Sequence, residues 1–209
     1  MPDAPLPRTP WRLRRPASPP PPAGVSPAVF LDRDGVLNEV LGDGARARSP
    51  RGAADLALTD GAKVATRRLA ARGYRLIVVT NQPDVARGLM TAEVAEALTR
   101  STMEQLQLDD AYVCPHDGPD RCSCRKPGPG MLLAARRDWA LDLGSSWLVG
   151  DRWVDIGAAQ AAGVRSVLLE SPYSWDPSGG VAPPHGLEPT VVAPDLTAAV
   201  DAIVNAPPR

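Results

Sequence analysis

The sequence predicts an α/β domain of three layers, in which a mostly parallel sheet is covered by helices on both faces. Short apolar runs alternate with stretches of helical periodicity from residue 28 onward, and such alternation indicates βαβ units. Residues 28–31 are apolar throughout and residues 74–79 are rich in Ile and Val, which is typical of strands buried on both faces. With 209 residues the chain is long enough for one such domain with a real core.

Six apolar runs predict the strands. Each is short, rich in aliphatic or aromatic residues and bounded by polar residues, Gly or Pro. In open parallel sheets, ligands bind beyond the carboxyl ends of the strands, so the residue that follows each run matters most for function. The expected strands are residues 28–31, 74–79, 111–113, 147–149, 165–169 and 190–192.

Start and stop signals predict the helices between these strands. Thr91 is an N-cap residue and Glu93 lies in the first turn that follows it. Pro129 suits a first helical turn, and Gly73 and Gly163 stop two of the helices in the C′ position. The expected helices are residues 60–70, 92–106, 129–141, 156–162 and 195–204.

Residues 1–27 are predicted to form a disordered Pro-rich tail, and residues 28–209 the folded domain. Ten of the 24 prolines lie in this tail, and such a composition favours extended polyproline-type backbone. Arg14-Arg15 is followed by PASPPPPAG, which lacks the apolar segment of a secretory signal.

The overall composition limits the partners. The net charge is −1 and no basic stripe stands out, so a nucleic-acid partner is not expected. No apolar run approaches the ~18 residues of a membrane helix. We therefore expect a cytoplasmic monomer that acts on a small molecule. Three cysteines without an export signal favour thiols or metal ligands over disulfides.

Two carboxylates, Asp32 and Asp34, follow the first strand in the run FLDRDGVLN. Asp32 can attack phosphorus and form an aspartyl phosphate, and Asp34 can protonate the leaving oxygen and then deprotonate the attacking water. Attack of an anion on an anion needs neutralising charge. Mg²⁺, held with the help of Asp151, and the Lys126 ammonium can supply it. Thr80, after the second strand, can donate its hydroxyl to a phosphoryl oxygen.

DxDG after one strand, Thr after the next, Lys before a helix and GDxxxD after a later strand resemble the four motifs of the haloacid-dehalogenase-like (HAD) phosphatase superfamily. The resemblance implies a HAD-like fold and a hydrolase in which Asp32 is the nucleophile and Asp34 the general acid and base. It also implies that Thr80 and Lys126 bind the transferring phosphoryl group. A single motif of this kind is common by chance, whereas four in order at strand ends are not.

The same resemblance implies the magnesium ligands. These are Asp32, the backbone carbonyl of Asp34, and Asp151, with Asp155 orienting the metal shell from one helical turn further on. Superfamily members that keep the phosphoenzyme for transport resemble DKTG at the first motif, with Thr in the place of Asp34. The Asp here favours hydrolysis, and therefore a phosphatase. A zinc-stabilised interaction module with a dead phosphatase site is a weaker alternative, because no motif is missing.

All three cysteines and one of the two histidines fall within eleven residues, as Cys114, His116, Cys122 and Cys124. Three thiolates and one imidazole form a closed tetrahedral zinc set, so a structural Zn²⁺ is expected. Each arm is an i, i+2 pair, which extended backbone can direct toward one ion. The zinc loop would fix the adjacent residues 125 and 126 over the active site. The alternative is three free thiols with an incidental histidine.

Longer matches, namely VVTNQ followed by ARG and the CxCRKPxPGM segment, resemble two neighbouring families. These are the D-glycero-D-manno-heptose 1,7-bisphosphate 7-phosphatases and the histidinol-phosphate phosphatases. The first implies removal of the 7-phosphate from the heptose bisphosphate or a related sugar phosphate, and histidinol phosphate is the alternative substrate. Pro83-Asp84 stand where the usual motif has Ser-Gly. The expected substrate-binding residues are Asn81, Gln82, Arg87 and Arg125.

The predicted enzyme is capless. No large insertion lies between residues 37 and 60 or between residues 80 and 126, which leaves only a flap at residues 38–49 and the zinc loop around the site. Arg46 and Arg48 in this flap, and Arg51 beyond it, could meet a second phosphate or could form a solvated basic loop.

Overall fold

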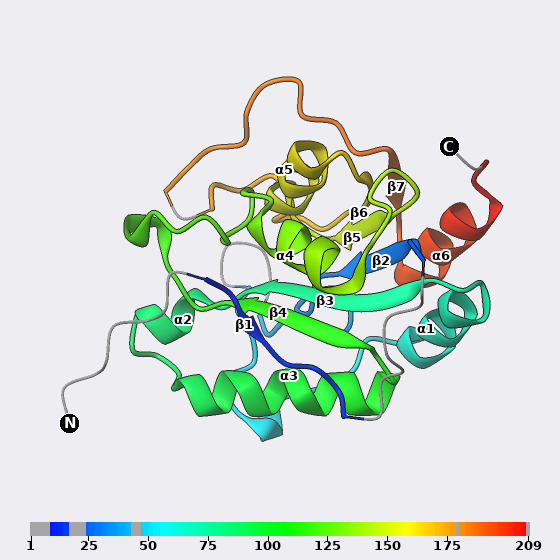
Figure 1. Cartoon of the computed structure of the whole chain (residues 1–209). Coiled ribbons are helices and arrows are strands. Elements are labelled where there is room, and N and C mark those ends of the chain that lie inside the picture. Colours follow the sequence, from blue (N-terminus) through cyan, green and yellow to red (C-terminus); the bar gives the residue numbers. More distant parts are fainter. Residues whose placement is uncertain (1–8, 17–23, 43–46, 179, 208–209) are drawn as a thin grey trace.

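The computed structural model describes residues 9–16, 24–42, 47–178 and 180–207. Seven strands of this part of the chain form one sheet, in the order β1-β4-β3-β2-β5-β6-β7 (Figure 1). β1 is antiparallel to β4, and every other neighbouring pair is parallel. The predicted parallel sheet is therefore confirmed, with one antiparallel strand added at its edge.

The predicted helices and strands are present in the predicted order, together with several short elements that were not predicted. The strands are β1 (Trp11–Arg12), β2 (Ala28–Leu31), β3 (Arg75–Asn81), β4 (Asp110–Cys114), β5 (Trp147–Gly150), β6 (Arg165–Leu169) and β7 (Val191–Ala193). The α-helices are α1 (Ala62–Ala71), α2 (Pro83–Ala86), α3 (Ala92–Leu106), α4 (Gly130–Trp139), α5 (Trp153–Ala162) and α6 (Leu196–Asn205), and the 3-10 helices are η2 (Ala53–Asp55) and η3 (Gly118–Asp120). None of the described helices has the length and apolar character needed to cross a membrane.

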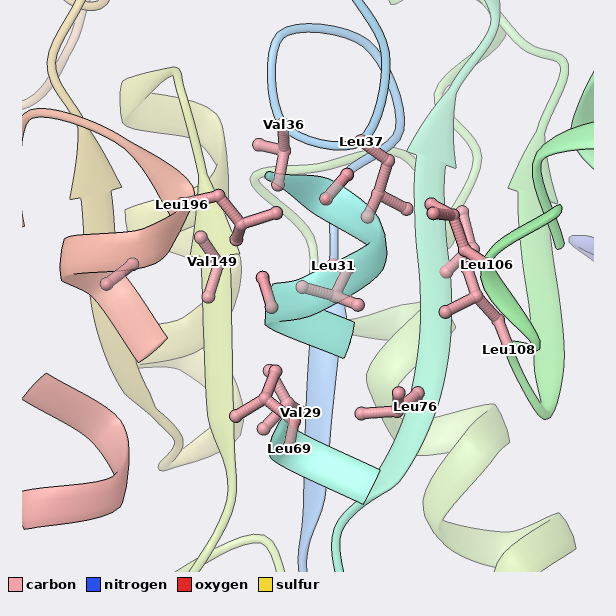
Figure 2. Packing of buried hydrophobic residues seen from close by; sticks show 14 of the residues in the cluster. Val29, Leu31, Val36, Leu37, Leu69, Leu76, Leu106, Leu108, Val149 and Leu196 are labelled. Carbon is pink, nitrogen blue, oxygen red and sulfur yellow. The ribbon is translucent and has the colours of Figure 1, made fainter. Parts of the chain in front are cut away.

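Two apolar cores lie on opposite faces of the sheet. On one face α1, α3 and α6 pack against the strands, and Figure 2 shows Leu69 and Leu196 meeting Val29, Leu31 and Val149 there. On the other face, α4 and α5 pack over the alternate residues of the same strands. The strand residues there are Phe30, Ile77, Val79 and Leu148, and their helix partners include Met131, Leu132 and Ala159. Residues 28–31 are fully buried, because successive side chains of one strand enter both cores.

Helix ends follow the predicted capping signals, except that Pro129 is the N-cap of α4 rather than a residue of its first turn and that α5 begins early. The Thr91 side chain accepts a hydrogen bond from Val94 N at 3.3 Å, and Gly163 closes α5 with a φ of 71°. α5, however, begins at residue 153 rather than at 156. The reason is local: the Asp155 carboxylate accepts a hydrogen bond from the backbone of Arg152 at 3.2 Å and so closes an earlier first turn.

The predicted disorder of residues 1–27 is wrong for the segment around β1. Trp11 and Arg12 pair with β4, and Leu13 is 4% exposed in the core beside α3. Arg12 Nε also lies 2.8 Å from the buried carboxylate of Asp110. The Pro-rich composition masks a short apolar–polar alternation, and this alternation covers the open edge of β4. Residues 1–8 and 17–23 lie outside the described part of the chain.

Candidate active site

The carboxyl ends of the central strands meet at a pocket of about 450 Å³. Asp32 follows β2, Thr80 lies at the end of β3 and Asp151 follows β5, while Lys126 precedes α4. The predicted residues that line this pocket are Asp32, Asp34, Thr80, Asn81, Gln82, Arg87, Arg125, Lys126 and Asp151. Asp155 is fully buried beside Lys126.

Lys126 is a buried cation held by two carboxylates. Its side chain is 1% exposed, and its Nζ lies 2.8 Å from Asp32 Oδ2 and 2.5 Å from Asp155 Oδ1. Nζ also donates to the Val79 carbonyl at 2.9 Å. Burial opposes the charge, but Asp155 and Asp32 outweigh it and raise the pKa of Lys126 above its usual value. The ammonium is thus a fixed positive charge beside Asp32.

Asn81 makes backbone contacts to Lys126. Its Nδ2 donates to the Lys126 carbonyl and its Oδ1 accepts from the Lys126 amide, both at 3.1 Å. Asn81 was expected to bind substrate, and although it lines the pocket, its amide fixes the segment that carries Lys126. Gln82, also expected to bind substrate, donates from Nε2 to Thr80 Oγ1 at 2.9 Å and to Asp34 Oδ2 at 2.8 Å.

Asp32 lies in a strongly negative environment. Burial is the main cause that raises its pKa to about 6. Lys126 opposes this shift, and Asp155 and Asp34 add to it. Its Oδ1 accepts a hydrogen bond from the Arg33 amide at 2.7 Å, which orients the carboxylate at the end of β2.

Three buried carboxylates form a cluster that could hold a cation. Oxygen atoms of Asp32, Asp151 and Asp155 lie within 4.8 Å of one another. Burial, followed by the charges of Asp32 and Asp155, raises the pKa of Asp151 well above its ordinary value. Among the described residues, buried Asp151 Oδ1 has no hydrogen-bond partner. A hard divalent cation with oxygen ligands fits this set, because it would compensate both the repulsion and the unpaired oxygen.

Gly35 gives Asp151 the space for this arrangement. A Cβ at position 35 would lie 2.0 Å from Asp151 Oδ2, and the φ of 81° is in the left-handed region. The glycine of the DxDG motif therefore serves both the turn and the close approach of the carboxylate.

Asp34 is held by Arg33, a residue that no sequence motif indicated. Arg33 Nε donates to Asp34 Oδ1 and Arg33 Nη2 donates to Asp34 Oδ2, both at 2.9 Å. Arg33 Nη1 donates to Thr99 Oγ1 at 3.1 Å. Asn38 and Gln82 donate to the same carboxylate at 2.9 and 2.8 Å. Burial alone would raise the pKa of Asp34, but Arg33 and these amides hold it below its usual value.

A second residue that the sequence did not indicate is Tyr173, which follows β6 in a Pro/Gly-rich loop and lines the pocket. Its side chain lies beside Asp151, and burial, followed by the charge of this carboxylate, raises the pKa of Tyr173. The Arg152 guanidinium lies 5.3 Å from the centre of the Tyr173 ring. No spacing or motif points to this tyrosine, because a long loop places it.

Cys114, His116, Cys122 and Cys124 come together as one cluster. His116 Nδ1 lies 3.5 Å from Cys114 Sγ and 3.4 Å from Cys124 Sγ, and Cys122 Sγ lies 3.7 and 3.5 Å from the same two sulfurs. Zinc–sulfur bonds of about 2.3 Å in a tetrahedron place two sulfurs ~3.7 Å apart, so the set fits such an ion. Hydrogen bonding from Cys124 is the main cause that lowers the pKa of Cys114 to about 6, which favours a thiolate.

The cluster adjoins the pocket through residues 125 and 126. Arg125 Nη1 donates to the His116 carbonyl at 3.1 Å, and its side chain is 13% exposed at the pocket wall. Arg87 is bound through Nε and Nη2 to Asp117 at 2.7 and 2.9 Å. Arg48 of the flap and Arg51 beyond it also line the pocket, whereas Arg46 lies outside the described residues.

Comparison with known proteins supplies relatives for this arrangement. Residues 123–199 match a family model described as HAD-hydrolase-like. The D-glycero-β-D-manno-heptose-1,7-bisphosphate 7-phosphatase of Rhodopseudomonas palustris is 37% identical over 159 residues, which is 69% of this chain and 83% of that protein. The enzyme of the same name from Escherichia coli K12 is 38% identical over 68% of this chain and 78% of that protein.

Two solved structures share the fold. The D,D-heptose 1,7-bisphosphate phosphatase of B. bronchiseptica, complexed with magnesium and phosphate, has a TM-score of 0.70 at 28% identity, over 86% of this chain and 98% of that one. A protein from Mesorhizobium loti that is described as a HAD-like phosphatase has a TM-score of 0.71 at 28% identity, over 94% of this chain and 93% of that one.

Proposed function

Because the chain belongs to the HAD-like phosphatase family that includes the D-glycero-β-D-manno-heptose-1,7-bisphosphate 7-phosphatases, we propose that it removes the 7-phosphate of this heptose bisphosphate or of a related sugar phosphate. The observation that carries the proposal is the buried contact of Asp32 with Lys126 at the floor of the pocket, next to Asp151 and Asp155. The family makes the chain a phosphoric monoester hydrolase.

In the first step, an oxygen of Asp32 attacks the phosphorus, the bond to the sugar oxygen breaks, and Asp34 gives that oxygen its proton. Lys126 and the Thr80 hydroxyl bind the oxygens of the phosphoryl group, whose charge grows as the new bond forms. The outcome is an aspartyl phosphate on Asp32 and a free sugar hydroxyl.

In the second step, water attacks the phosphorus of this aspartyl phosphate and Asp34 takes its proton. Asp34 has given up its proton in the first step and is therefore the carboxylate that accepts this one. Arg33, Asn38 and Gln82 hold it in position for the transfer. Asp32 is released as a carboxylate, with Lys126 still beside it. The phosphate then leaves through the open side of the pocket.

We assign Mg²⁺ to the carboxylate cluster, held by Asp32, Asp151 and the backbone carbonyl of Asp34. When bound, it neutralises negative charge on the nucleophile and on the phosphoryl group. Asp155 contributes by holding Lys126 at 2.5 Å. The magnesium and phosphate in the B. bronchiseptica structure support this assignment.

We assign a structural Zn²⁺ to the Cys₃His cluster. Four protein ligands leave no open position for chemistry, so its proposed role is to order the segment before α4. Arg125 and Lys126 follow the last ligand, Cys124, directly, and their positions depend on the loop.

Substrate comparison tests the proposed function. With Mg²⁺ present, kcat/KM for the heptose bisphosphate should exceed that for histidinol phosphate by at least about tenfold. The heptose substrate is favoured because the relatives described above carry that name. A preference for histidinol phosphate would assign the chain to the alternative family. The cytoplasmic location and the monomeric state remain predictions, which cell fractionation and size-exclusion chromatography test.

A further inference from the structure

The pocket contains one Arg–Asp pair that the proposed hydrolysis does not use. Arg51 lies just beyond the flap, and Asp84 lies in the first turn of α2. Arg51 Nε is 2.7 Å from Asp84 Oδ2, and the two side chains are 36% and 12% exposed. Both residues line the pocket wall.

The neighbouring arginines are already bound by other carboxylates. Arg87 uses Nε and Nη2 for Asp117, at 2.7 and 2.9 Å, and its remaining Nη1 is 3.7 Å from Asp84 Oδ1, which is beyond hydrogen-bond distance. Arg48 pairs with Asp55 at 3.3 Å. Within the described residues, Asp84 Oδ1 therefore has no hydrogen-bond donor, although a cation lies near it.

Arg51 also has unused hydrogen-bonding groups. Its Nε makes the bond to Asp84, and within the described residues its two Nη groups make none. Arg51 and Asp84 therefore present a donor and an acceptor side by side on the pocket wall. Their charges compensate each other.

This pattern matches a hydroxyl group better than a phosphate. A hydroxyl donates one hydrogen bond and accepts others, whereas an ionised phosphate only accepts. A phosphate placed here would meet the Asp84 carboxylate as a like charge. We propose that the Arg51–Asp84 pair binds a hydroxyl group of the sugar part of the substrate and so selects polyhydroxylated phosphomonoesters. This inference rests on the proposed function and adds a residue pair that determines its specificity.

The test uses three phosphomonoester substrates. The heptose 1,7-bisphosphate has hydroxyls and a distal phosphate, the heptose 7-phosphate has hydroxyls alone, and p-nitrophenyl phosphate has neither. Asp84→Ala removes the acceptor, and Asp84→Asn keeps the shape of the side chain if the alanine variant does not fold. The control is Asp201→Ala, which breaks the Arg68–Asp201 pair of 2.6 Å between α1 and α6, outside the pocket.

We expect Asp84→Ala to lower kcat/KM for both sugar phosphates by about 10- to 100-fold, the usual cost of losing a hydrogen bond to a charged group. The kcat/KM for p-nitrophenyl phosphate should stay within about twofold of that of the unaltered enzyme. Equal losses on all three substrates would show a structural role, and a loss on the bisphosphate alone would assign the pair to the distal phosphate; either result overturns the inference, as does no loss.

The same experiment separates this inference from the proposed function. If the unaltered enzyme does not prefer the sugar phosphates to p-nitrophenyl phosphate, the proposed function fails and the inference fails with it. If the unaltered enzyme prefers them and Asp84→Ala keeps that preference, only the inference fails. Asp201→Ala should match the unaltered enzyme on all three substrates.

Discussion

At the scale of single residues, the pocket floor is organised around an excess of buried negative charge. Asp32, Asp151 and Asp155 lie within 4.8 Å of one another, and Lys126 compensates only part of their charge. Buried charges of one sign are costly unless a counter-ion accompanies them. The free energy of unfolding should therefore depend on protons and on divalent cations. Catalysis should depend on Asp32, the carboxylate that contacts Lys126 and also belongs to the cluster.

Replacing Asp32 by Asn tests its role as the nucleophile. The amide keeps the size of the side chain but cannot form an acyl phosphate, so we expect the release of phosphate to fall by more than about 10³-fold. Rapid-quench analysis should find a phosphorylated Asp32 in the active enzyme only. A variant that folds, as circular dichroism would show, and keeps its turnover would refute this role.

Asp32 and Asp151 should make the metal-free protein more stable in mild acid. Their folded pKa values are raised, that of Asp32 to about 6, whereas an unfolded Asp titrates near ~3.9. The folded state then binds more protons, and the free energy of unfolding rises as the pH falls from about 7 to 4. For Asp32 the gain is on the order of 2 kcal/mol.

Thermal unfolding at pH 7.5 and pH 5 checks this pH dependence. In buffer without Mg²⁺, Tm should be higher at pH 5. Mg²⁺ should raise Tm more at pH 7.5, because it competes with the bound protons. The control is Asp32→Asn, in which the difference between the two pH values should shrink. The opposite dependence of Tm on pH would contradict the described electrostatics.

At the scale of elements, two segments with little apolar core of their own determine how the site and the sheet edge are completed. The zinc loop between β4 and α4 carries Arg125 and Lys126 to the pocket, and Asn81 fixes the backbone of Lys126 from β3. β1 contributes only two residues to the sheet, yet it covers β4 along its outer edge.

Loss of zinc should impair the phosphatase even when Mg²⁺ is saturating. Metal analysis should find about one equivalent of zinc. Cys122→Ser should reduce this content, lower Tm and lower kcat/KM by about tenfold or more, because residues 125 and 126 lose their support. The matched control is Ser123→Ala, an exposed neighbour. Full activity in a zinc-free Cys122→Ser variant would contradict the proposed link between the loop and the site.

β1 should stabilise the domain through the bond of Arg12 to Asp110. Asp110 is fully buried, and it also accepts from Trp139 Nε1 at 2.7 Å. Arg12→Leu should lower the free energy of unfolding by about 1–3 kcal/mol, because it leaves that carboxylate partly unpaired. Denaturant titration measures this. The control is Arg137→Leu, at an exposed arginine 3.4 Å from Asp138. This substitution should change the free energy of unfolding by less than ~0.5 kcal/mol. Equal effects of the two substitutions would show that β1 contributes little to the stability of the domain.

At the scale of the whole molecule, the sequence predicts the contacts that strand order or local spacing determines, and it misses those that depend on side-chain direction or on long irregular loops. The proximity of Asp32, Thr80 and Asp151 could be predicted from the sequence, because parallel strands end at one edge of a sheet. Arg33 and Tyr173 could not. The contact of Arg33 with Asp34 depends on which way a buried side chain turns, and Tyr173 reaches Asp151 from a long irregular loop.

The same limit explains the N-terminal segment. Its proline content predicted a tail, but the two residues of β1 gain their structure from β4, which lies about a hundred positions further along the chain. Composition describes a segment in isolation and contains no information about such a distant partner. The zinc cluster is the opposite case, because its four ligands lie within eleven residues and local spacing is enough to find them.

The position of β2 between β3 and β5 has a consequence for biosynthesis. On the ribosome, β2 and β3 emerge early and can pair, but the second edge of β2 stays bare until residues 147–150 have been translated. Nearly three-quarters of the polypeptide must therefore be made before its central strand is shielded on both sides. A translational pause within that interval would leave an apolar strand open to aggregation.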